Sequence, residues 1–239
     1  MEPPVKTPRP RRSRGSLSRD QVVGAALALA DESGFARLTM PALARRLDCG
    51  VMTLYGHVES KGDLTAAIVE RGLRDLRLPR PLPPDAAGVL AAWGRALRTT
   101  LLEHPALPAI FNQQPVVGPG ILRGVEALLG ALSRAGYPPG PGVHAIYAVL
   151  NYTVGFVGWE LPRSRSGPEE SYARAWRQVA AGLSSADFPL VTGVLDEMGT
   201  IAGEIQFEIG LVALTNGLVA SRPTFAAGSS AASNRPAPT

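Results

Sequence analysis

The sequence is poor in cysteine and aromatic residues, and it has no long apolar run without charge. Cys49 is the only cysteine in the 239 residues, which excludes a disulfide within the chain and fits a reducing, cytoplasmic setting. No segment approaches the roughly 20 uncharged apolar residues that a membrane-spanning helix needs. The basic N-terminus lacks the apolar core of a secretory signal. We therefore expect a cytoplasmic protein that does not enter a membrane.

The sequence also lacks the patterns of catalytic and metal sites. It contains no glycine-rich phosphate loop, cysteine cluster, nucleophile elbow or paired carboxylates. His104 and His144 have no helix-spaced His or Glu partner of the kind that a metal site uses. We interpret His104 instead as a residue near the end of a helix, where its charge is favourable. The prediction is a protein without enzyme activity, metal site or cofactor.

Apolar residues make up 45% of the chain, enough for a sizeable core. Apolar side chains recur with helical spacing, and no segment shows a convincing strand period. The predicted class is therefore all-α. Expected helices beyond the first third cover residues 85–104, 120–135, 143–161, 169–181 and 190–220, with a polar loop at 163–168.

Basic residues are concentrated in the first third of the chain. Residues 1–80 contain 14 Lys and Arg against 9 Asp and Glu, whereas the rest contains 10 against 11. Six basic side chains form the leading edge of this region: Lys6, Arg9, Arg11, Arg12, Arg14 and Arg19. Such a cluster favours a polyanion, because neutralising phosphates releases counterions. A solvated tail that only aids solubility is the alternative.

Polar start signals divide the first third into short helices. Ser18 is a helix N-cap candidate with Gln21 as its capping-box partner, and Gly34 ends that helix. Thr39 and Ser60 are further N-cap candidates, the latter for a helix that runs to about Leu78. Prolines between residues 79 and 84 then break the chain.

This pattern predicts four segments along the chain. Residues 1–16 form a disordered basic arm, and 17–79 a DNA-binding domain. Residues 85–221 are expected to form a larger helical domain, and 222–239 a disordered tail; the resemblance described below implies ligand binding and dimerisation for the larger domain.

Residues 39–58 have the spacing of a helix-turn-helix. A short helix from Thr39 to Leu47 is followed by a turn and a second helix from Val51 to Val58. The turn requires a residue that tolerates left-handed backbone geometry, and Asp48 is a permitted substitute for glycine there. The second helix presents its N-terminal end outward, as a helix that enters the DNA major groove does. A helical hairpin inside an ordinary bundle is the alternative.

The residue types near this second helix suit DNA. Thr53, Tyr55 and His57 can hydrogen-bond phosphates, and Lys61 adds a positive charge. Val51 and Met52 can touch thymine methyl groups but cannot make bidentate hydrogen bonds to bases. Arg45 and Arg46 can reach the backbone or base edges. The predicted DNA-binding residues are Thr39, Arg45, Val51, Met52, Thr53, Tyr55, His57 and Lys61.

Residues 18–78 resemble the DNA-binding domain of TetR-type transcriptional regulators. The resemblance rests on Ala25–Leu29, Gly34, Leu38–Met40, Leu43-Ala44, Leu47, Thr53–Tyr55, His57-Val58, Lys61 and Leu64. Weaker similarity to the tetracycline-repressor branch continues through Leu101–His104, Tyr152–Gly155 and Phe207–Leu211.

The resemblance implies a homodimer that binds palindromic DNA. Two long C-terminal helices, here 143–161 and 190–220, would form a four-helix bundle with those of the partner. A small molecule in the C-terminal domain would change the distance between the two recognition helices. Because the grooves are about 34 Å apart, a shift of a few Å ends simultaneous docking, and ligand binding releases the DNA.

The ligand is predicted with less detail than the fold. Phe111 and Arg77 stand where the tetracycline-repressor branch has ligand-contacting histidines, so we expect an uncharged, partly apolar molecule rather than a magnesium–tetracycline complex. Gly56 replaces a large aromatic residue, so the operator sequence is not carried over. Candidate ligand-binding residues are Trp93, Leu97, Phe111, Gln114, Tyr147, Asn151 and Trp159. Core packing for the aromatics and solvated positions for the amides are the alternative.

We therefore predict a ligand-responsive transcriptional repressor. An activator, or a regulator without a small-molecule inducer, is the nearest alternative. A helical protein-interaction scaffold is the alternative from another class. A small helical enzyme has the least support, because the sequence shows no catalytic constellation.

Overall fold

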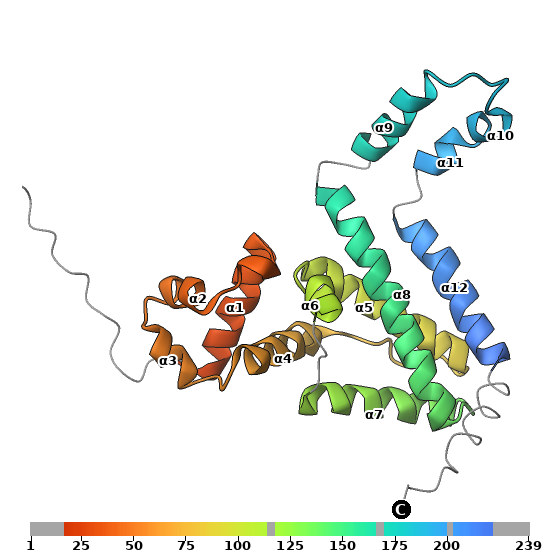
Figure 1. The fold of residues 1–239 in the computed structure, drawn as a ribbon. Helices are drawn as coiled ribbons and strands as arrows, with labels where there is room; N and C mark the ends of the chain where they lie inside the picture. The colour runs from red at the N-terminus through yellow and green to blue at the C-terminus, as the bar shows by residue number, and fades with distance from the viewer. Residues whose placement is uncertain (1–16, 114–117, 166–169, 200–202, 222–239) are drawn as a thin grey trace, which may run out of the picture. The chain divides into compact units, whose positions relative to one another are not determined.

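The computed structural model describes residues 17–113, 118–165, 170–199 and 203–221. Over these residues the regular structure is entirely helical (Figure 1), which confirms the all-α prediction. None of the described helices combines the length and hydrophobicity required to cross a membrane. The predicted arm 1–16 and tail 222–239 lie outside the described residues.

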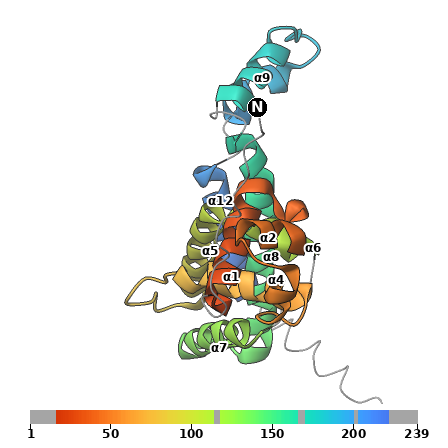
Figure 2. The same cartoon turned by 90° about the vertical axis from the view of Figure 1, so that its left-hand side faces the viewer.

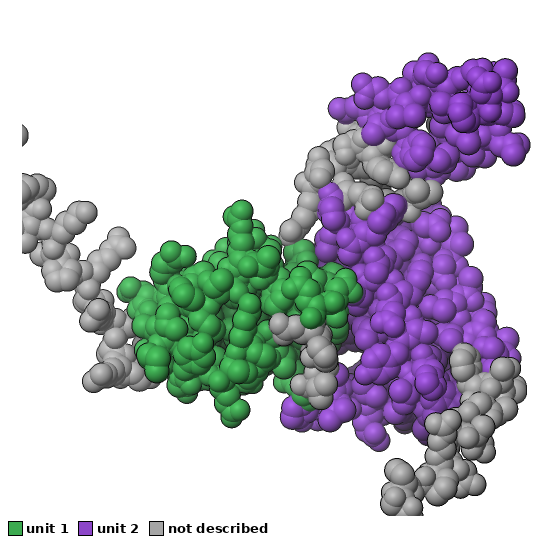
Figure 3. Space-filling view, in the orientation of Figure 1, with its two compact units in different colours: residues 1–75, 104–118 green, residues 76–103, 119–239 purple. Residues whose placement is uncertain are grey.

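The chain divides into two compact units, which Figure 3 shows in different colours. Unit 1 consists of residues 1–75 and 104–118, and unit 2 of residues 76–103 and 119–239. The segment 104–118 thus belongs with the N-terminal helices, whereas the predicted C-terminal domain of 85–221 includes it.

Unit 1 is built from short helices whose ends are fixed by polar side chains. They are α1 (Arg19–Ser33), α2 (Met40–Arg46), α3 (Val51–Tyr55), α4 (Lys61–Gly72) and α6 (Leu107–Gln113), with 3-10 turns at Phe35–Arg37 and Leu73–Asp75. Ser18, Thr39 and Ser60 each accept a backbone N–H three residues ahead, which confirms the three predicted N-caps.

Two helix ends differ from the prediction. The second helix of the motif ends at Tyr55 rather than Val58, and the helix capped by Ser60 ends at Gly72 rather than near Leu78. Glycine explains both, because Gly56 follows the first of these helices directly and Gly72 is the last residue of the second. Glycine costs about 1 kcal/mol relative to alanine inside a helix.

Helix α6 is held in unit 1 by a close contact with Gly72 and by a hydrogen bond from its N-terminal end to Asp31. Leu107 is fully buried, and a Cβ on Gly72 would lie only 2.7 Å from its Cδ1 atom. Asp31 accepts the backbone N–H of Ala106 at 3.0 Å and lies 3.0 Å from Nδ1 of His104. His104 is therefore held by a carboxylate of α1, a partner that the sequence did not reveal.

Unit 2 contains the longer helices. They are α5 (Ala86–Glu103), α7 (Pro119–Arg134), α8 (Pro139–Arg165), α9 (Glu170–Ala180), α10 (Pro189–Thr192), α11 (Leu195–Gly199) and α12 (Glu204–Ala220). Helices α5, α8 and α12 pack against one another, and α7 packs against α5 and α8 (Figures 1 and 2). Helix α9 packs against α11.

Glycines and tyrosines hold α12 close to its neighbours. A Cβ on Gly94 of α5 would lie 2.7 Å from Leu211 and 3.1 Å from Val149, so these helices approach too closely for a larger residue. Tyr152 donates its hydroxyl to the carbonyl of Phe207 at 2.8 Å, and the buried Tyr137 donates to Leu218 at 3.0 Å. These bonds fix which face of α12 is turned inward.

The predicted helix 190–220 is wrong as a continuous element. The region contains α10, α11 and α12, with Gly193 following α10 and Gly203 preceding α12. Glycine interrupts helices readily, because it gains no side-chain contact and loses the most backbone freedom. Residues 163–165 of the predicted loop 163–168 belong instead to α8, which continues to Arg165.

Candidate functional site

The recognition-helix candidate α3 is anchored by its inward face. Leu54 is fully buried, and it is accompanied in the core by Leu43, Ala44 and Val58. The preceding turn contains Asp48 with a φ of 51°, which confirms its predicted left-handed geometry. A five-residue helix is not stable alone, so these contacts determine where its outward side chains point.

The outward face of α3 is the most exposed apolar point of unit 1. Met52 is 80% exposed and Tyr55 45% exposed. Among the described residues of unit 1, these are the only large hydrophobic side chains that are exposed. Thr53 is exposed as well, whereas Val51 and His57 are half-buried. The structure thus separates Met52 from Val51, which the sequence treated alike.

The basic residues near α3 differ in their freedom. Arg46 makes a bidentate ion pair with Glu32 at 2.6 and 2.7 Å, and these hydrogen bonds lower the pKa of the Glu32 carboxyl. Arg45 is exposed beside it. Arg46 therefore has a structural partner in α1, while Arg45 remains a candidate for DNA contact. Thr39 is exposed, and its hydroxyl accepts the N–H of Ala42.

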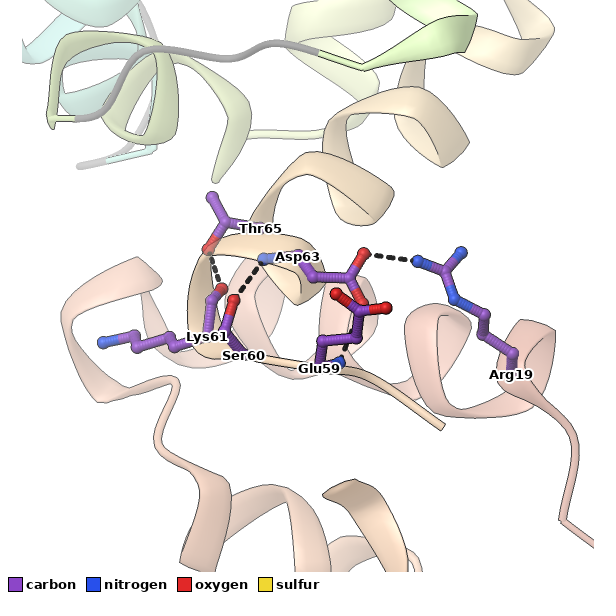
Figure 4. A network of polar contacts seen from close by, with 6 residues as sticks. All are labelled: Arg19, Glu59, Ser60, Lys61, Asp63 and Thr65. Carbon is purple, nitrogen blue, oxygen red and sulfur yellow. Dashed lines mark hydrogen bonds and ion pairs between the residues drawn. The ribbon is translucent and has the colours of Figure 1, made fainter. Parts of the chain in front are cut away.

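A polar network fixes the start of α4 (Figure 4). The carboxylate of Asp63 forms an ion pair with Arg19 at 2.6 Å and accepts the backbone N–H of Glu59 at 3.0 Å. The backbone N–H of Asp63 donates to the hydroxyl of Ser60. The exposed Lys61 lies with its Nζ atom 5.7 Å from the centre of the Phe35 ring. Figure 4 shows Arg19 and Lys61 on opposite sides of this turn.

A shallow hollow of about 380 Å³ lies beside the end of α3. Its lining residues are Arg19, Tyr55, Gly56, His57, Val58, Glu59 and Asp63. Arg19 and Asp63, which both line the hollow, form a hydrogen bond of 2.6 Å. They are 44 positions apart in the sequence, so their spacing did not indicate this contact. Gly56 has no side chain to fill the hollow between Tyr55 and His57, so its backbone lines the hollow there.

Cys49 sits in the turn before α3 and is half-buried. Burial raises the pKa of its thiol, and the neighbouring Asp48 raises it further. The thiolate is the reactive form of cysteine, so this environment supports a packing role over redox sensing.

The candidate ligand residues differ in burial and belong to both units. Trp93 and Leu97 are buried on α5, and Trp159 on α8 is half-buried. Tyr147 and Asn151 are exposed on α8, while Phe111 belongs to unit 1. Gln114 lies outside the described residues.

Sequence reasoning missed the polar centre of unit 2. Arg98 makes a bidentate pair with Glu160 at 2.6 and 3.3 Å, and the two side chains are only 15% and 10% exposed. The guanidinium also lies 5.2 Å from the centre of the Phe207 ring. Burial raises the pKa of Tyr152, which stacks on Phe207. Residues 62 positions apart form this pair, and no local pattern marks them.

Helices α8 and α12 each present an apolar face that unit 2 does not cover. On α8 the exposed face carries Val143 and Tyr147. On α12 it carries Ile205 and Ile209, which are 75% and 60% exposed, together with Val212. Among the described residues, no atom beyond the helix's own backbone lies within 4 Å of a Cβ added to Gly155 or Gly217.

His, Cys, Asp and Glu are common metal ligands, and all four occur in the described part of the chain. No group of three or more His, Cys, Asp or Glu side chains is close enough there to hold an ion.

Two family descriptions match the chain. Residues 80–222 match the tetracyclin repressor-like C-terminal domain, and residues 22–68 match the bacterial regulatory proteins of the tetR family. An HTH-type transcriptional regulator of Saccharopolyspora erythraea is 31% identical over 185 residues, 76% of each chain. The class A tetracycline repressor from transposon 1721 of Escherichia coli is 29% identical over 210 residues, 86% of this chain and 92% of that protein.

A solved structure shows the same fold. The TetR family protein ActR of Streptomyces coelicolor, in complex with actinorhodin, has a TM-score of 0.74 and 25% sequence identity. The alignment covers 87% of this chain and 98% of that one.

Proposed function

Because the chain belongs to the TetR family of transcriptional regulators, we propose that it is a homodimeric repressor released from a palindromic operator by a small molecule. The observation that carries this proposal is the combination of two uncovered surfaces. One is the exposed tip of α3 in unit 1, and the other is the apolar face of α8 and α12 in unit 2. The first suits DNA and the second suits another copy of the chain.

The apolar face supports self-association. Ile205, Ile209 and Val212 of α12 form an exposed row at helical spacing. Gly155 and Gly217 leave open space on the same two helices. Glycine destabilises a helix by about 1 kcal/mol relative to alanine, and a partner helix that approaches closely would offset this cost. We propose that α8 and α12 pair with the same helices of a second copy.

The DNA contacts divide into positioning and reading. Tyr55, Lys61, Thr53 and His57 hydrogen-bond or neutralise phosphates, which sets the register without selecting a sequence. Thr39 and Arg45 flank them from α2. Met52 and Val51 are left to contact bases.

We propose that the inducer binds inside unit 2 near Trp93 and Leu97. Thr153 of α8 supports this location, because its hydroxyl is fully buried without a hydrogen-bond partner among the described residues. It lies one helical turn after Val149, which faces Gly94 of α5. A buried unpaired hydroxyl costs about 1 to 3 kcal/mol. An uncharged ligand with one polar group against Thr153 would recover that cost.

Two relatives also support a small-molecule ligand. ActR is described in complex with actinorhodin, and another relative is a tetracycline repressor. A cytoplasmic regulator without enzyme activity or cofactor is consistent with these relatives.

The proposal is tested by footprinting the purified chain on the DNA beside its own gene. Protection of a palindrome, lost steeply as salt rises, supports it. Tyr55→Phe and Lys61→Ala should weaken binding to every sequence by a similar factor, because they remove phosphate contacts. No protected palindrome at moderate salt would contradict the proposal.

The ligand is tested on the same complex with a panel of uncharged aromatic compounds. A compound that releases the DNA supports an inducible repressor. Thr153→Val should keep the fold and the DNA affinity but weaken this release. A scaffold, or a regulator without an inducer, predicts that no compound releases the DNA.

A further inference from the structure

The basic N-terminal arm, residues 1–16, is a charged segment that the proposed function leaves without a role. It contains five Lys and Arg against a single acidic residue, Glu2. Four of the five are arginines within six consecutive positions: Arg9, Arg11, Arg12 and Arg14. Because this arm directly precedes the first helix of unit 1, the position of that helix decides what the arginines can reach.

The arm joins unit 1 beside the surface proposed to contact DNA. Ser18 caps α1, so the chain enters its first helix at Arg19. Arg19 lines the same hollow as Tyr55 and His57, two residues proposed to contact phosphates. Its side chain pairs with Asp63 at 2.6 Å, which ties this end of α1 to the start of α4 (Figure 4). The arm therefore starts at a surface that a bound duplex would cover.

The length of the arm matches the distance to a neighbouring groove. Arg14 and Arg9 lie five and ten positions before Arg19. Pro8 and Pro10 favour an extended backbone, which rises about 3.1 Å per residue and so places these arginines about 15 to 30 Å from the start of α1. The minor groove next to an occupied major groove lies half a helical turn away, about 17 Å. The arginines can thus reach this minor groove while α3 occupies the major groove.

The guanidinium group suits the minor groove of A·T-rich DNA. Runs of A·T pairs narrow this groove and strengthen its negative potential, which attracts inserted arginines. A G·C pair instead places the 2-amino group of guanine in the groove. Basic arms that precede helical DNA-binding units can bind DNA in this way. An arm that touched only phosphates would show no direct preference between these base pairs.

We propose that residues 9–14 bind the minor groove beside each half-site and select A·T pairs there. This inference rests on the proposed function, because it requires unit 1 on a duplex. It adds recognised base pairs outside the helix-turn-helix and leaves the reading by α3 unchanged. The operator would then include A·T-rich segments at symmetric positions next to its two half-sites.

The experiment separates the two grooves by using inosine·cytosine pairs. Inosine lacks the 2-amino group of guanine, so an I·C pair resembles A·T in the minor groove and G·C in the major groove. The full-length chain is first used to select palindromes from random duplex DNA. The selected operator is then built with A·T, I·C or G·C in the roughly five base pairs, half a helical turn, that adjoin each half-site. The outer and inner sides of the half-sites are changed in separate duplexes.

For the parent chain, G·C on one of these sides should weaken binding about fivefold per half-site, whereas I·C should bind as A·T does. A variant that combines Arg9→Ala, Arg11→Ala, Arg12→Ala and Arg14→Ala should still bind the palindrome but should bind the three kinds of flank equally. Its salt dependence should be shallower, by about 0.9 in the log–log slope for each arginine that the DNA engages. The matched control with Arg→Lys at the same four positions keeps the charges and should keep the slope of the parent.

Three results would overturn the inference and leave the proposed function standing. One is a parent chain that binds A·T, I·C and G·C flanks equally well. Another is a parent chain that treats I·C like G·C, because the flank would then be read in the major groove. The third is an alanine variant that keeps the parent's preference for A·T. A chain that selects no palindrome would instead contradict the proposed function, and this inference with it.

Discussion

The uncovered faces of the two units differ in chemistry. On unit 1 the exposed face of α3 holds Met52 beside the hydroxyl groups of Thr53 and Tyr55. On unit 2 the exposed faces of α8 and α12 hold a row of branched apolar side chains around open glycines. The first surface can remain in water and meet a hydrated polyanion. The second gains most from contact with another apolar surface.

This difference fits two separate roles, DNA reading for unit 1 and pairing of two copies for unit 2. A single α3 makes few contacts, so tight binding requires two copies held at one spacing. The surface that provides this spacing has no need to resemble the surface that reads DNA. Substitutions on the exposed face of α8 and α12 should therefore change the affinity for DNA without altering the sequence preference that α3 sets.

The largest effect should follow from charging the apolar face of α12. Ile209→Glu places a carboxylate in the proposed interface, and loss of the paired copy should lower operator affinity about a thousandfold. Sedimentation should show a monomer, and circular dichroism should show unchanged helicity. Leu122→Glu is the matched control, because Leu122 is 61% exposed on α7 of the same unit. A variant Ile209→Glu that remains dimeric would show that this face is not the interface.

The two sides of α3 should respond oppositely to truncation. Leu54→Ala removes a fully buried side chain, so urea unfolding should show a loss of about 2 to 5 kcal/mol. Met52→Ala should leave the free energy of unfolding nearly unchanged. Equal losses for the two variants would mean that α3 does not project from the core.

The predictability of the two units differs for a physical reason. In unit 1 the caps at Ser18, Thr39 and Ser60 and the left-handed Asp48 act over three or four residues, so spacing alone identified them. In unit 2 the contact between Arg98 and Glu160 spans 62 residues, and that between Arg95 and Glu208 spans 113. No local pattern encodes such pairs, which is why the polar centre of unit 2 was missed.

The burial of a charge pair provides the next comparison, within unit 2 alone. Arg98→Ala should leave Glu160 without its partner in the interior and cost about 3 kcal/mol of unfolding free energy. Arg95→Ala breaks the pair with Glu208, whose side chains are 50% and 32% exposed, and should cost less than about 1 kcal/mol. Thermal unfolding of both variants checks this order. Similar costs would contradict the difference in burial.

The smallest effect should appear in acid. Arg46 lowers the pKa of Glu32, so this pair adds stability above the unfolded pKa of about 4.5 and loses it as pH falls through the lower folded value. Glu32→Gln should therefore unfold with a shallower pH dependence below about pH 5. Urea midpoints between neutral and acid pH measure the slope. An unchanged acid slope would show that the pair does not influence stability.

We propose that two α3 tips read one palindrome because α8 and α12 hold them at a fixed spacing. It is tested most directly by inserting about five base pairs, half a helical turn, between the half-sites of the selected operator. The insertion turns the half-sites to opposite faces of the duplex. We expect the dimer then to bind no more tightly than it binds a single half-site. Undiminished affinity for the lengthened operator would contradict it.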